Sequence, residues 1–339
     1  MRPASAFVAI LAFAGAAHAA EPPPSESAPA PTVVAKGVWW IPGGIRAGHQ
    51  PDGNSVVLEA PDGLIVVDTG RHAWHREAIL ALAQERHRPI VAIVNSHWHL
   101  DHVSGNPALR AAYPGLKVYA SRAIDGARAG FLAKSERESA GYLTDESIPA
   151  TMRDDIRADA ETIRNGAALE PDVPVTSSAT MSLGGRKVQV HLAADAATAG
   201  DVWLYDAATH IAIVGDLVTL PAPFLDTACP DGWQRALGEV AASKFEKVIP
   251  GHGAPMDRAQ FESYRAAFTG FVACAGSTTA KEACSAQWAD AVQPLLGGEA
   301  KERQRAEAFA AYYVDLLRAN GGRSAYCASG KAAAGGGSP

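Results

Sequence analysis

The sequence predicts a layered α/β fold. Short apolar segments rich in Val and Ile alternate with segments of helical pattern, and no internal repeat recurs at a solenoid period. A cluster of polar residues, NSHWHLDH at 95–102, directly follows one of the apolar segments. The exit of a central strand is where α/β enzymes place their chemistry, so this cluster marks the expected site.

Apolar runs bounded by turn residues indicate the strands. SVVLEA and GLIVVD flank the turn Pro61-Asp62 and predict a hairpin. The expected strands cover residues 55–60, 63–68, 89–95, 116–121, 186–192, 201–206, 210–218 and the strand and turn of 244–253.

Three stretches have helical patterns. A helix is expected from Ala73 to His87, opened by Asp68-Thr69-Gly70. Residues 122–170 are charged and poor in β-branched residues, which predicts an inserted helical segment. Helical periodicity from Pro255 to about Asn320 predicts a C-terminal helical extension, residues 256–327, after a main domain of residues 33–255.

The two ends of the chain are not expected to belong to the folded part. Residues 1–20 combine Arg2, an apolar run from Ala6 to Ala17 and Ala17-His18-Ala19, which is the pattern of a secretory signal peptide cleaved near Ala19 or Ala20. An uncleaved membrane anchor is the alternative. The Pro-rich residues 21–32 predict a disordered linker, and residues 328–339 a disordered tail. A periplasmic or secreted protein is therefore expected.

The charge pattern disfavours several partners. The formal net charge is −6, and it becomes −7 when Arg2 leaves with the leader. No Lys/Arg run occurs, so neither nucleic acid nor an anionic lipid surface is expected as a partner. No later stretch is long and apolar enough to span a bilayer, and integral membrane association is not expected. A small-molecule substrate remains, while the oligomeric state is not encoded in any pattern we recognise.

The chain has four cysteines, none in a CxxC or CxxxC spacing. In an oxidising compartment they predict two disulfides, for which three connectivities are possible. The short separation favours Cys274–Cys284, which leaves Cys229 with Cys327. Buried free thiols are the alternative.

The histidine cluster has the composition of a metal site. Histidine and aspartate are ligands suited to zinc. In an extended segment His97, His99 and Asp101 would point to one side and His102 elsewhere, so the loop could serve two adjacent metals. Trp98 would then pack under the loop. A histidine-rich surface loop without function is the alternative.

HWHLDH resembles the HxHxDH signature of the metallo-β-lactamase superfamily. Three further motifs resemble that family in the expected order: VVDTG at 66–70, VGDLV at 214–218 and IPGHG at 249–253. The resemblance covers roughly residues 33–255. It implies a four-layer αββα sandwich, with two sheets back to back, helices outside and metal ions at one edge.

The resemblance also implies roles for individual residues. His97 and His99 would bind one zinc ion, Asp101, His102 and His252 a second, and Asp216 would bridge them. Asp101 would also hold the attacking water and accept its proton. Asp68 would either orient the histidine loop or cap the helix that begins near residue 73.

One expected ligand is missing. Members of the family usually carry a histidine in a stretch like HTxGD, whereas this chain has DAATAGD at 195–201, with Ala197 at the histidine position. Asp195 could replace it, His191 could reach in from its strand, or one zinc could sit mainly at Asp101, His102 and His252. His191 could equally be a strand histidine that faces solvent or a neighbouring helix.

The implied activity is hydrolysis by a zinc-activated water of an ester, lactam, thioester or phosphoester-type small molecule. Because of Ala197, a metal- or ligand-binding protein with reduced or no turnover is the alternative. Phe224 and Trp233 could contact a substrate or serve as ordinary packing. Of the other histidines, His72, His75 and His87 are expected to face water, and His49 and His210 to be isolated.

Overall fold

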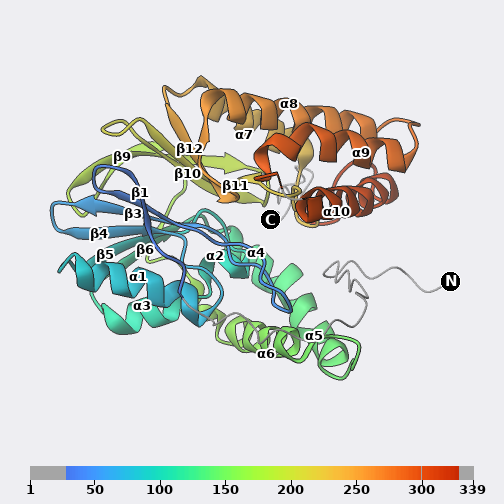
Figure 1. Ribbon diagram of the computed structural model, residues 1–339. Helices are drawn as coiled ribbons and strands as arrows, with labels where there is room; N and C mark the ends of the chain where they lie inside the picture. Colours follow the sequence, from blue (N-terminus) through green and yellow to red (C-terminus); the bar gives the residue numbers. More distant parts are fainter. Residues whose placement is uncertain (1–27, 299, 328–339) are drawn as a thin grey trace, which may run out of the picture.

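The computed structural model describes residues 28–298 and 300–327, which form four layers. Two β-sheets lie back to back, with α1 (Ala73–Glu85) and α3 (Asn106–Ala112) outside one sheet. The helices α7 to α10 cover the outer face of the other sheet (Figure 1). This αββα sandwich confirms the predicted fold. The predicted leader, most of the linker and the tail lie outside the described residues.

The strands form two sheets within the described residues. The first sheet has the order β1 (Thr32–Ala35), β2 (Val38–Ile41), β3 (Ser55–Ala60), β4 (Gly63–Val67), β5 (Ile90–Val94), β6 (Lys117–Ala120), β7 (Val173–Pro174). The second has the order β13 (Met256–Asp257), β12 (Lys247–His252), β11 (Ile211–Thr219), β10 (Gly200–Asp206), β9 (Arg186–Ala194), β8 (Ala179–Leu183). The sequence patterns missed β1, β2, β7, β8 and β13, which are short or partly exposed.

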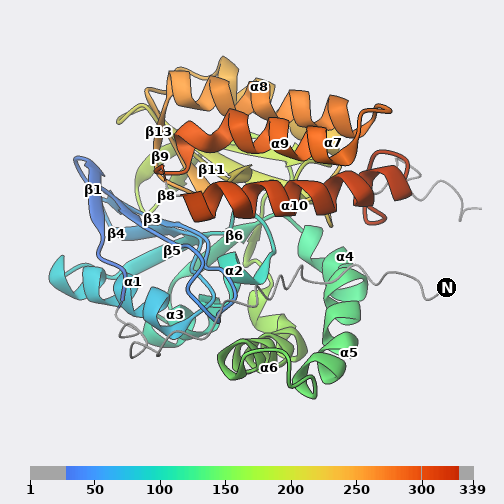
Figure 2. The same cartoon turned by 45° about the vertical axis from the view of Figure 1, so that its right-hand side comes forward.

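The remaining helices fall into two sets. Within residues 122–170 lie α4 (Ala123–Ala129), α5 (Phe131–Leu143), α6 (Ala150–Arg164) and the 3-10 turn Gly166–Leu169. Towards the C-terminus lie α7 (Pro230–Ala242), α8 (Arg258–Ala275), α9 (Lys281–Val292), the 3-10 turn Gln293–Leu295 and α10 (Ala300–Ala319). Figure 2 shows α5 and α6 standing away from the sheets, beside the edge where α2 (Leu100–Val103) lies. No helix among the described residues is long and apolar enough to cross a membrane.

Alternating side chains build the core on both faces of each sheet. In β10, Val202 and Leu204 face the space between the sheets, whereas Trp203 and Tyr205 face the outer helices. Side chains alternate along a strand, so a strand buried on both faces must be apolar throughout. This explains why the central strands appear in the sequence as continuous apolar runs.

The helix after β4 begins at Ala73, as predicted, but it is not opened by a cap from Asp68. Its N-cap is His72, which makes no side-chain capping bond, and the helix ends at Glu85 rather than His87. Asp68 has a positive φ of 59°, so the chain leaves β4 in a sharp turn. Since Asp68 does not cap the helix, its carboxylate is available for other contacts.

Two disulfides join parts of the helical layer. Cys274–Cys284 links α8 to α9, and Cys229–Cys327 ties the residue before α7 to the segment after α10. Both favoured pairings are confirmed, and none of the described cysteines is free.

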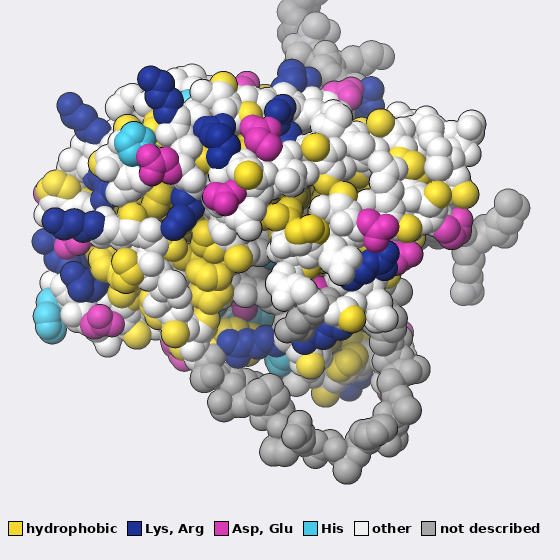
Figure 3. Space-filling view, turned by 45° about the horizontal axis from the view of Figure 1, so that its top comes forward, with side chains coloured by type: hydrophobic (Ala, Val, Ile, Leu, Met, Phe, Trp, Pro, Cys, Tyr) yellow, Lys and Arg dark blue, Asp and Glu magenta, His cyan; other side chains and the backbone are white. Residues whose placement is uncertain are grey.

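On the face drawn in Figure 3, Lys and Arg side chains are interspersed with Asp and Glu, so this face carries no basic patch.

Candidate metal centre

The six candidate ligands meet at one edge of the two sheets. His97 and His99 follow β5, Asp101 and His102 lie in α2, Asp216 lies in β11 and His252 ends β12. Because the chain turns into α2 at Leu100, Asp101 does not continue the extended segment of the two histidines. The expectation that His97, His99 and Asp101 share one side is therefore wrong, and Asp101 joins His102 instead.

The first group consists of His97, His99 and Asp216, whose ligand atoms lie within 4.8 Å of one another. Asp216 Oδ2 is 3.7 Å from His97 Nε2 and 4.0 Å from His99 Nδ1. All three residues are buried. Two imidazoles and a carboxylate form a donor set suited to zinc.

The second group consists of Asp101, His102 and His252, again within 4.8 Å. His252 Nε2 is 3.1 Å from Asp101 Oδ2 and 3.3 Å from His102 Nε2. Asp216 also borders this group, since its Oδ1 is 3.2 Å from His102 Nε2 and 3.6 Å from His252 Nε2. Asp216 therefore presents one carboxylate oxygen to each group.

Asp68 and Ser96 fix the histidine loop. Asp68 accepts hydrogen bonds from the backbone N–H of Ser96 at 2.7 Å and from Ser96 Oγ at 2.6 Å. Its Oδ2 also lies 2.8 Å from His102 Nδ1. A carboxylate on one ring nitrogen of a ligating histidine fixes the tautomer and leaves the other nitrogen for the metal. Of the two roles considered for Asp68, the contacts support orientation of the loop.

The buried carboxylates and histidines of the centre create an environment that favours a bound cation. Burial lowers the pKa of His99 to about 4 and that of His97 well below its usual value. Burial also lowers the pKa of His102, but the carboxylates of Asp216, Asp101 and Asp68 outweigh it and raise that pKa well above 6.5. The site therefore attracts positive charge to the point where the carboxylates converge.

The residues present fit a metal. His97 Nε2 and Asp216 Oδ1 are buried without a hydrogen-bond partner. With Nδ1–H directed to Asp68, His102 would turn the lone pair of Nε2 towards His252 and Asp216 once a metal ion takes the place of the second ring proton. Buried polar atoms left without partners are costly, and a cation bound by these atoms would remove that cost.

Neither proposed replacement for the histidine missing at Ala197 belongs to the groups found among the described residues. Ala197 is buried in the core behind the site. Asp195 is half-buried and has a positive φ of 52°, while His191 stacks on Trp203 with ring centroids 3.8 Å apart. His191 is half-buried and lies beside Trp203 on the outer face of the sheet, which agrees with a strand histidine that faces solvent or a neighbouring helix.

Several residues at the centre were not anticipated from the sequence. Thr227 Oγ1 lies 3.0 Å from His99 Nε2 and donates to the Ala197 carbonyl. Arg71 Nη2 is 3.8 Å from Asp101 Oδ1, and Arg71 also pairs with Asp159 of α6. A Cβ added at Gly53 would lie 2.3 Å from the His102 ring. Only the position of Arg71 after the VVDTG motif could have drawn attention to it.

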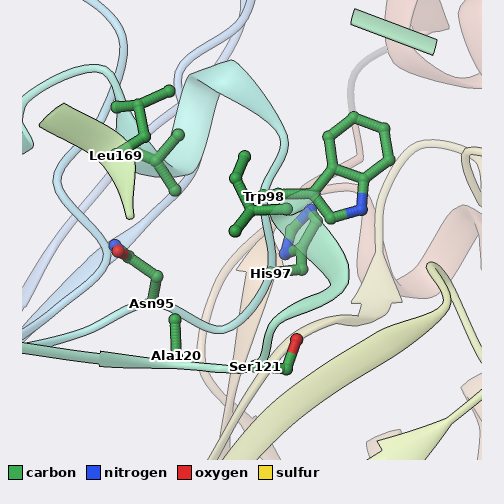
Figure 4. Close-up of a pocket in the computed structure, with 8 residues that line it drawn as sticks. Asn95, His97, Trp98, Ala120, Ser121 and Leu169 are labelled. Carbon is green, nitrogen blue, oxygen red and sulfur yellow. The ribbon is translucent and has the colours of Figure 1, made fainter. Parts of the chain in front are cut away.

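A cavity of about 350 Å³ opens beside His252. Apolar side chains including Leu220, Leu295 and Leu296 line it, together with Glu302 and Arg305 of α10. A much smaller cavity of about 10 Å³ is lined by residues that include Asn95, His97 and Trp98 (Figure 4). The larger cavity is the one with room for part of a ligand.

Of the aromatic residues considered near the site, one borders the metal centre and two are packed in the interior. Phe224 packs edge-on against His99, with ring centroids 4.9 Å apart, and borders the centre. Trp233 is fully buried, donates to the Leu217 carbonyl and packs on Phe268, so the suggestion that it contacts a substrate is wrong. Trp98 is buried and packs against the helical insert, in a cluster that includes Ile124 and Leu132.

Residues 50–252 match the metallo-β-lactamase superfamily, and this segment is more than half of the 339-residue chain. The chain therefore belongs to the metallo-β-lactamase superfamily. This confirms the family resemblance and agrees with the fold and with groups of His and Asp that could hold metal.

Two curated relatives are hydrolases. One is a linear primary-alkylsulfatase of Pseudomonas sp. (strain ATCC 19151), 25% identical over 225 residues that cover 59% of this chain and 41% of that protein. The other is a hydroxyacylglutathione hydrolase of Gloeobacter violaceus (strain ATCC 29082 / PCC 7421), 45% identical over 64 residues that cover 19% of this chain and 24% of that protein. The chain thus matches less than half of either relative's length.

A solved structure shares the fold. The metallo-β-lactamase FIM-1 from Pseudomonas aeruginosa, in its mono-zinc form, is 20% identical with a TM-score of 0.51, over 72% of this chain and 96% of that one. At this identity the similarity extends to the fold alone.

Proposed function

We propose that this protein is a zinc-dependent hydrolase of small molecules with an ester, lactam, thioester or phosphoester-type bond. The observation that carries the proposal is Asp216, which presents one oxygen to His97 and His99 and the other to His102 and His252. The six proposed ligands are His97, His99, Asp101, His102, Asp216 and His252, for one or two zinc ions. Zinc supplies Lewis-acid chemistry, which makes water more acidic and polarises the bond under attack.

Asp101 has the position and charge of a general base. Burial would raise its pKa, but His102 and His252 outweigh burial and hold the pKa well below its usual value. Asp101 is therefore ionised at neutral pH and can accept a proton from water. Arg71 lies beside its other oxygen and would hold the carboxylate in place.

The substrate would bind across His252 into the 350 Å³ cavity. Its apolar lining suits a hydrocarbon portion, and Arg305 is a polar group at the same wall. The names of the relatives suggest three probes, which are a linear alkyl sulfate ester, a hydroxyacylglutathione thioester and a β-lactam.

The test is hydrolysis of these probes by zinc-loaded protein and by Asp101→Ala. We expect turnover of at least one probe, and a loss of about 100-fold or more in kcat/KM for Asp101→Ala, because a positioned base contributes about 10²–10⁴-fold. Asp125→Ala is the matched control, since Asp125 is exposed on α4 and forms a surface ion pair with Arg122. Equal activity of Asp101→Ala and the control would contradict the assignment of Asp101.

A binding protein without turnover is the second candidate. Ala197 favours it, because the first group has only two histidines and Asp216. It predicts retained zinc and no hydrolysis of any probe. Absence of both zinc binding and turnover would rule out both candidates.

We also propose that the protein acts in the periplasm or outside the cell, after cleavage near Ala19 or Ala20. The sequence of residues 1–20 and the two disulfides support this, because disulfides persist in oxidising compartments. We expect N-terminal sequencing of protein from the periplasmic or secreted fraction to begin at residue 20 or 21. A cytoplasmic protein that retains Met1 would contradict the proposal.

A further inference from the structure

A second cluster of potential ligands lies outside the metal centre. It consists of His49 in the loop between β2 and β3, His72 before α1, and Asp155 of α6. One ligand atom from each residue lies within 4.8 Å of the others. The expectations that His72 faces water and that His49 is isolated are therefore wrong.

The expectation that His75 faces water is wrong as well, because His75 is buried and its Nε2 lies 2.8 Å from Ser55 Oγ. His87 is exposed, as expected.

The contacts within this cluster converge on Asp155. His49 Nδ1 lies 3.1 Å from Asp155 Oδ2, and His72 Nε2 lies 3.2 Å from Asp155 Oδ1. Only 8% of the His72 side chain and 7% of the Asp155 side chain are exposed. The three residues come from segments more than 20 positions apart in the sequence, so no local motif predicts that they meet.

Asp52 determines which nitrogen of His72 faces the cluster. His72 Nδ1 lies 2.8 Å from Asp52 Oδ2, while Asp52 also accepts from the backbone N–H of Arg71 and of His72 and from Trp74 Nε1. Asp52 offers only acceptor atoms, so Nδ1 donates to it. A carboxylate behind a histidine in this way is typical of metal-binding histidines.

The other ring nitrogen of His72 is left without a hydrogen-bond partner. His72 Nε2 is buried and points to Asp155, but the approach to Oδ1 does not have the geometry of a hydrogen bond. Trp74 stacks on the ring, with centroids 4.0 Å apart and an angle of 13°, and prevents it from turning away. A neutral imidazole would direct a lone pair at a carboxylate, so a positive charge is favoured between Nε2 and Asp155, either a proton on the ring or a metal ion.

We propose that His49, His72 and Asp155 form an additional, structural metal site, separate from the centre that contains Asp216. Two imidazoles and one carboxylate are a donor set for zinc, with water free to complete the coordination. The proposal does not depend on the hydrolase function.

The proposed metal would fasten α6 to the sandwich. The existing contacts between them are polar: Gln50 N–H donates to Asp155 at 2.8 Å, and Thr151 Oγ1 donates to the Gly48 carbonyl at 2.6 Å. One turn further along α6, Asp159 pairs with Arg71, whose other side faces Asp101. A metal at His49, His72 and Asp155 would thus fix the helix that supports Arg71 at the main centre.

The test is equilibrium dialysis of metal-stripped full-length protein against zinc, with elemental analysis of bound zinc per chain. We expect wild type to bind one equivalent more than Asp155→Asn, whatever number the main centre holds. Asp154→Asn is the matched control, because Asp154 is the neighbouring residue on α6 and 70% of its side chain is exposed. The control should bind as many equivalents as wild type.

His49→Ala is a second variant, useful if loss of the Gln50 contact prevents Asp155→Asn from folding. It should also bind one equivalent fewer, and hydrogen exchange in α6 should be slowed by zinc in wild type but not in this variant. If folded Asp155→Asn or His49→Ala binds as much zinc as wild type, the proposal is wrong and the cluster is an ion-pair network. Failure of the hydrolase proposal would leave the one-equivalent difference unchanged.

Discussion

At the scale of single residues, the site depends on side chains that hold the ligands as much as on the ligands. Asp68 binds Ser96 and His102 together, and its positive φ places it where the strand ends. Gly53 approaches the other side of the His102 ring, and its N–H donates to the Asp101 carbonyl at 3.0 Å. The His102 ring is therefore held between the Asp68 carboxylate and the backbone of Gly53, which packs closely against it.

Gly53→Ala should damage this arrangement. Its new Cβ would lie 2.3 Å from His102 Cε1, so the ring or the loop must shift. Overpacking of this kind costs about 1–3 kcal/mol, and we expect lower stability together with loss of zinc from the second group. Thermal denaturation and bound zinc per chain measure the two effects.

Gly115→Ala is the control for this change. No atom lies within 4 Å of a Cβ built at Gly115, so stability and zinc content should stay close to wild type. If Gly53→Ala behaves like Gly115→Ala, the close contact does not hold His102.

At the scale of elements, the C-terminal helices are joined to the loop that borders the site. Asp226 of that loop accepts hydrogen bonds from Tyr312 and Tyr313 of α10 at 3.0 and 3.1 Å. The next residue, Thr227, contacts His99. Helix α10 thereby supports one wall of the centre from a distance in sequence of more than 80 residues.

This junction predicts a pH effect on stability. Burial raises the pKa of Asp226 above its usual 3.8, although the two tyrosines lower it. The folded chain thus binds a proton more tightly than the unfolded chain, and Asp226 costs stability as the pH rises from 3.8 through the raised pKa. The free energy of unfolding of Asp226→Asn, relative to wild type, should increase over that window by at most about 1.4 kcal/mol per pH unit.

Denaturant unfolding of both proteins from pH 4 to 8 checks this expectation. Asn can still accept from one tyrosine and donate to the other, so the variant should fold. Parallel pH profiles for the two proteins would show that Asp226 does not titrate differently on folding.

At the scale of the whole molecule, the proposed metal centre joins the two halves of the sandwich. His97, His99, Asp101 and His102 follow β5 of one sheet, whereas Asp216 and His252 belong to β11 and β12 of the other. A metal bound between them would cross-link the two sheets at one edge.

Removal of the metal should therefore lower the stability of the whole chain. A ligand present at about 1,000 times its Kd stabilises the folded state by about 4 kcal/mol per site. We expect a chelator to lower Tm by roughly 8–16 °C, since about 1 kcal/mol corresponds to about 2–4 °C in a chain of this size. Differential scanning calorimetry before and after chelation, with zinc returned as the control, makes the measurement. An unchanged Tm would contradict a metal that links the sheets.

The sequence by itself determined the fold and the composition of the site. The buried strands are continuous apolar runs, and the helical layers follow periodicity, so both could be predicted from local physics. Which residues would meet was implied by the resemblance of HWHLDH, and of the motifs around Asp216 and His252, to the metallo-β-lactamase superfamily. Of the five strands that escaped prediction, β1, β7, β8 and β13 lie at sheet edges, and each of the five has five residues or fewer. Such short segments carry little periodicity.

Only the tertiary structure decided how these groups are arranged. It turned the chain into α2 at Leu100, so that Asp101 does not continue the extended segment of His97 and His99. It also brought the Asp68 carboxylate to the histidine loop and kept Asp195 and His191 out of both groups. It also brought His49, His72 and Asp155 together from three separate segments. The physical reason is that sequence patterns report burial and local geometry, whereas the meeting of distant polar side chains depends on how the layers pack.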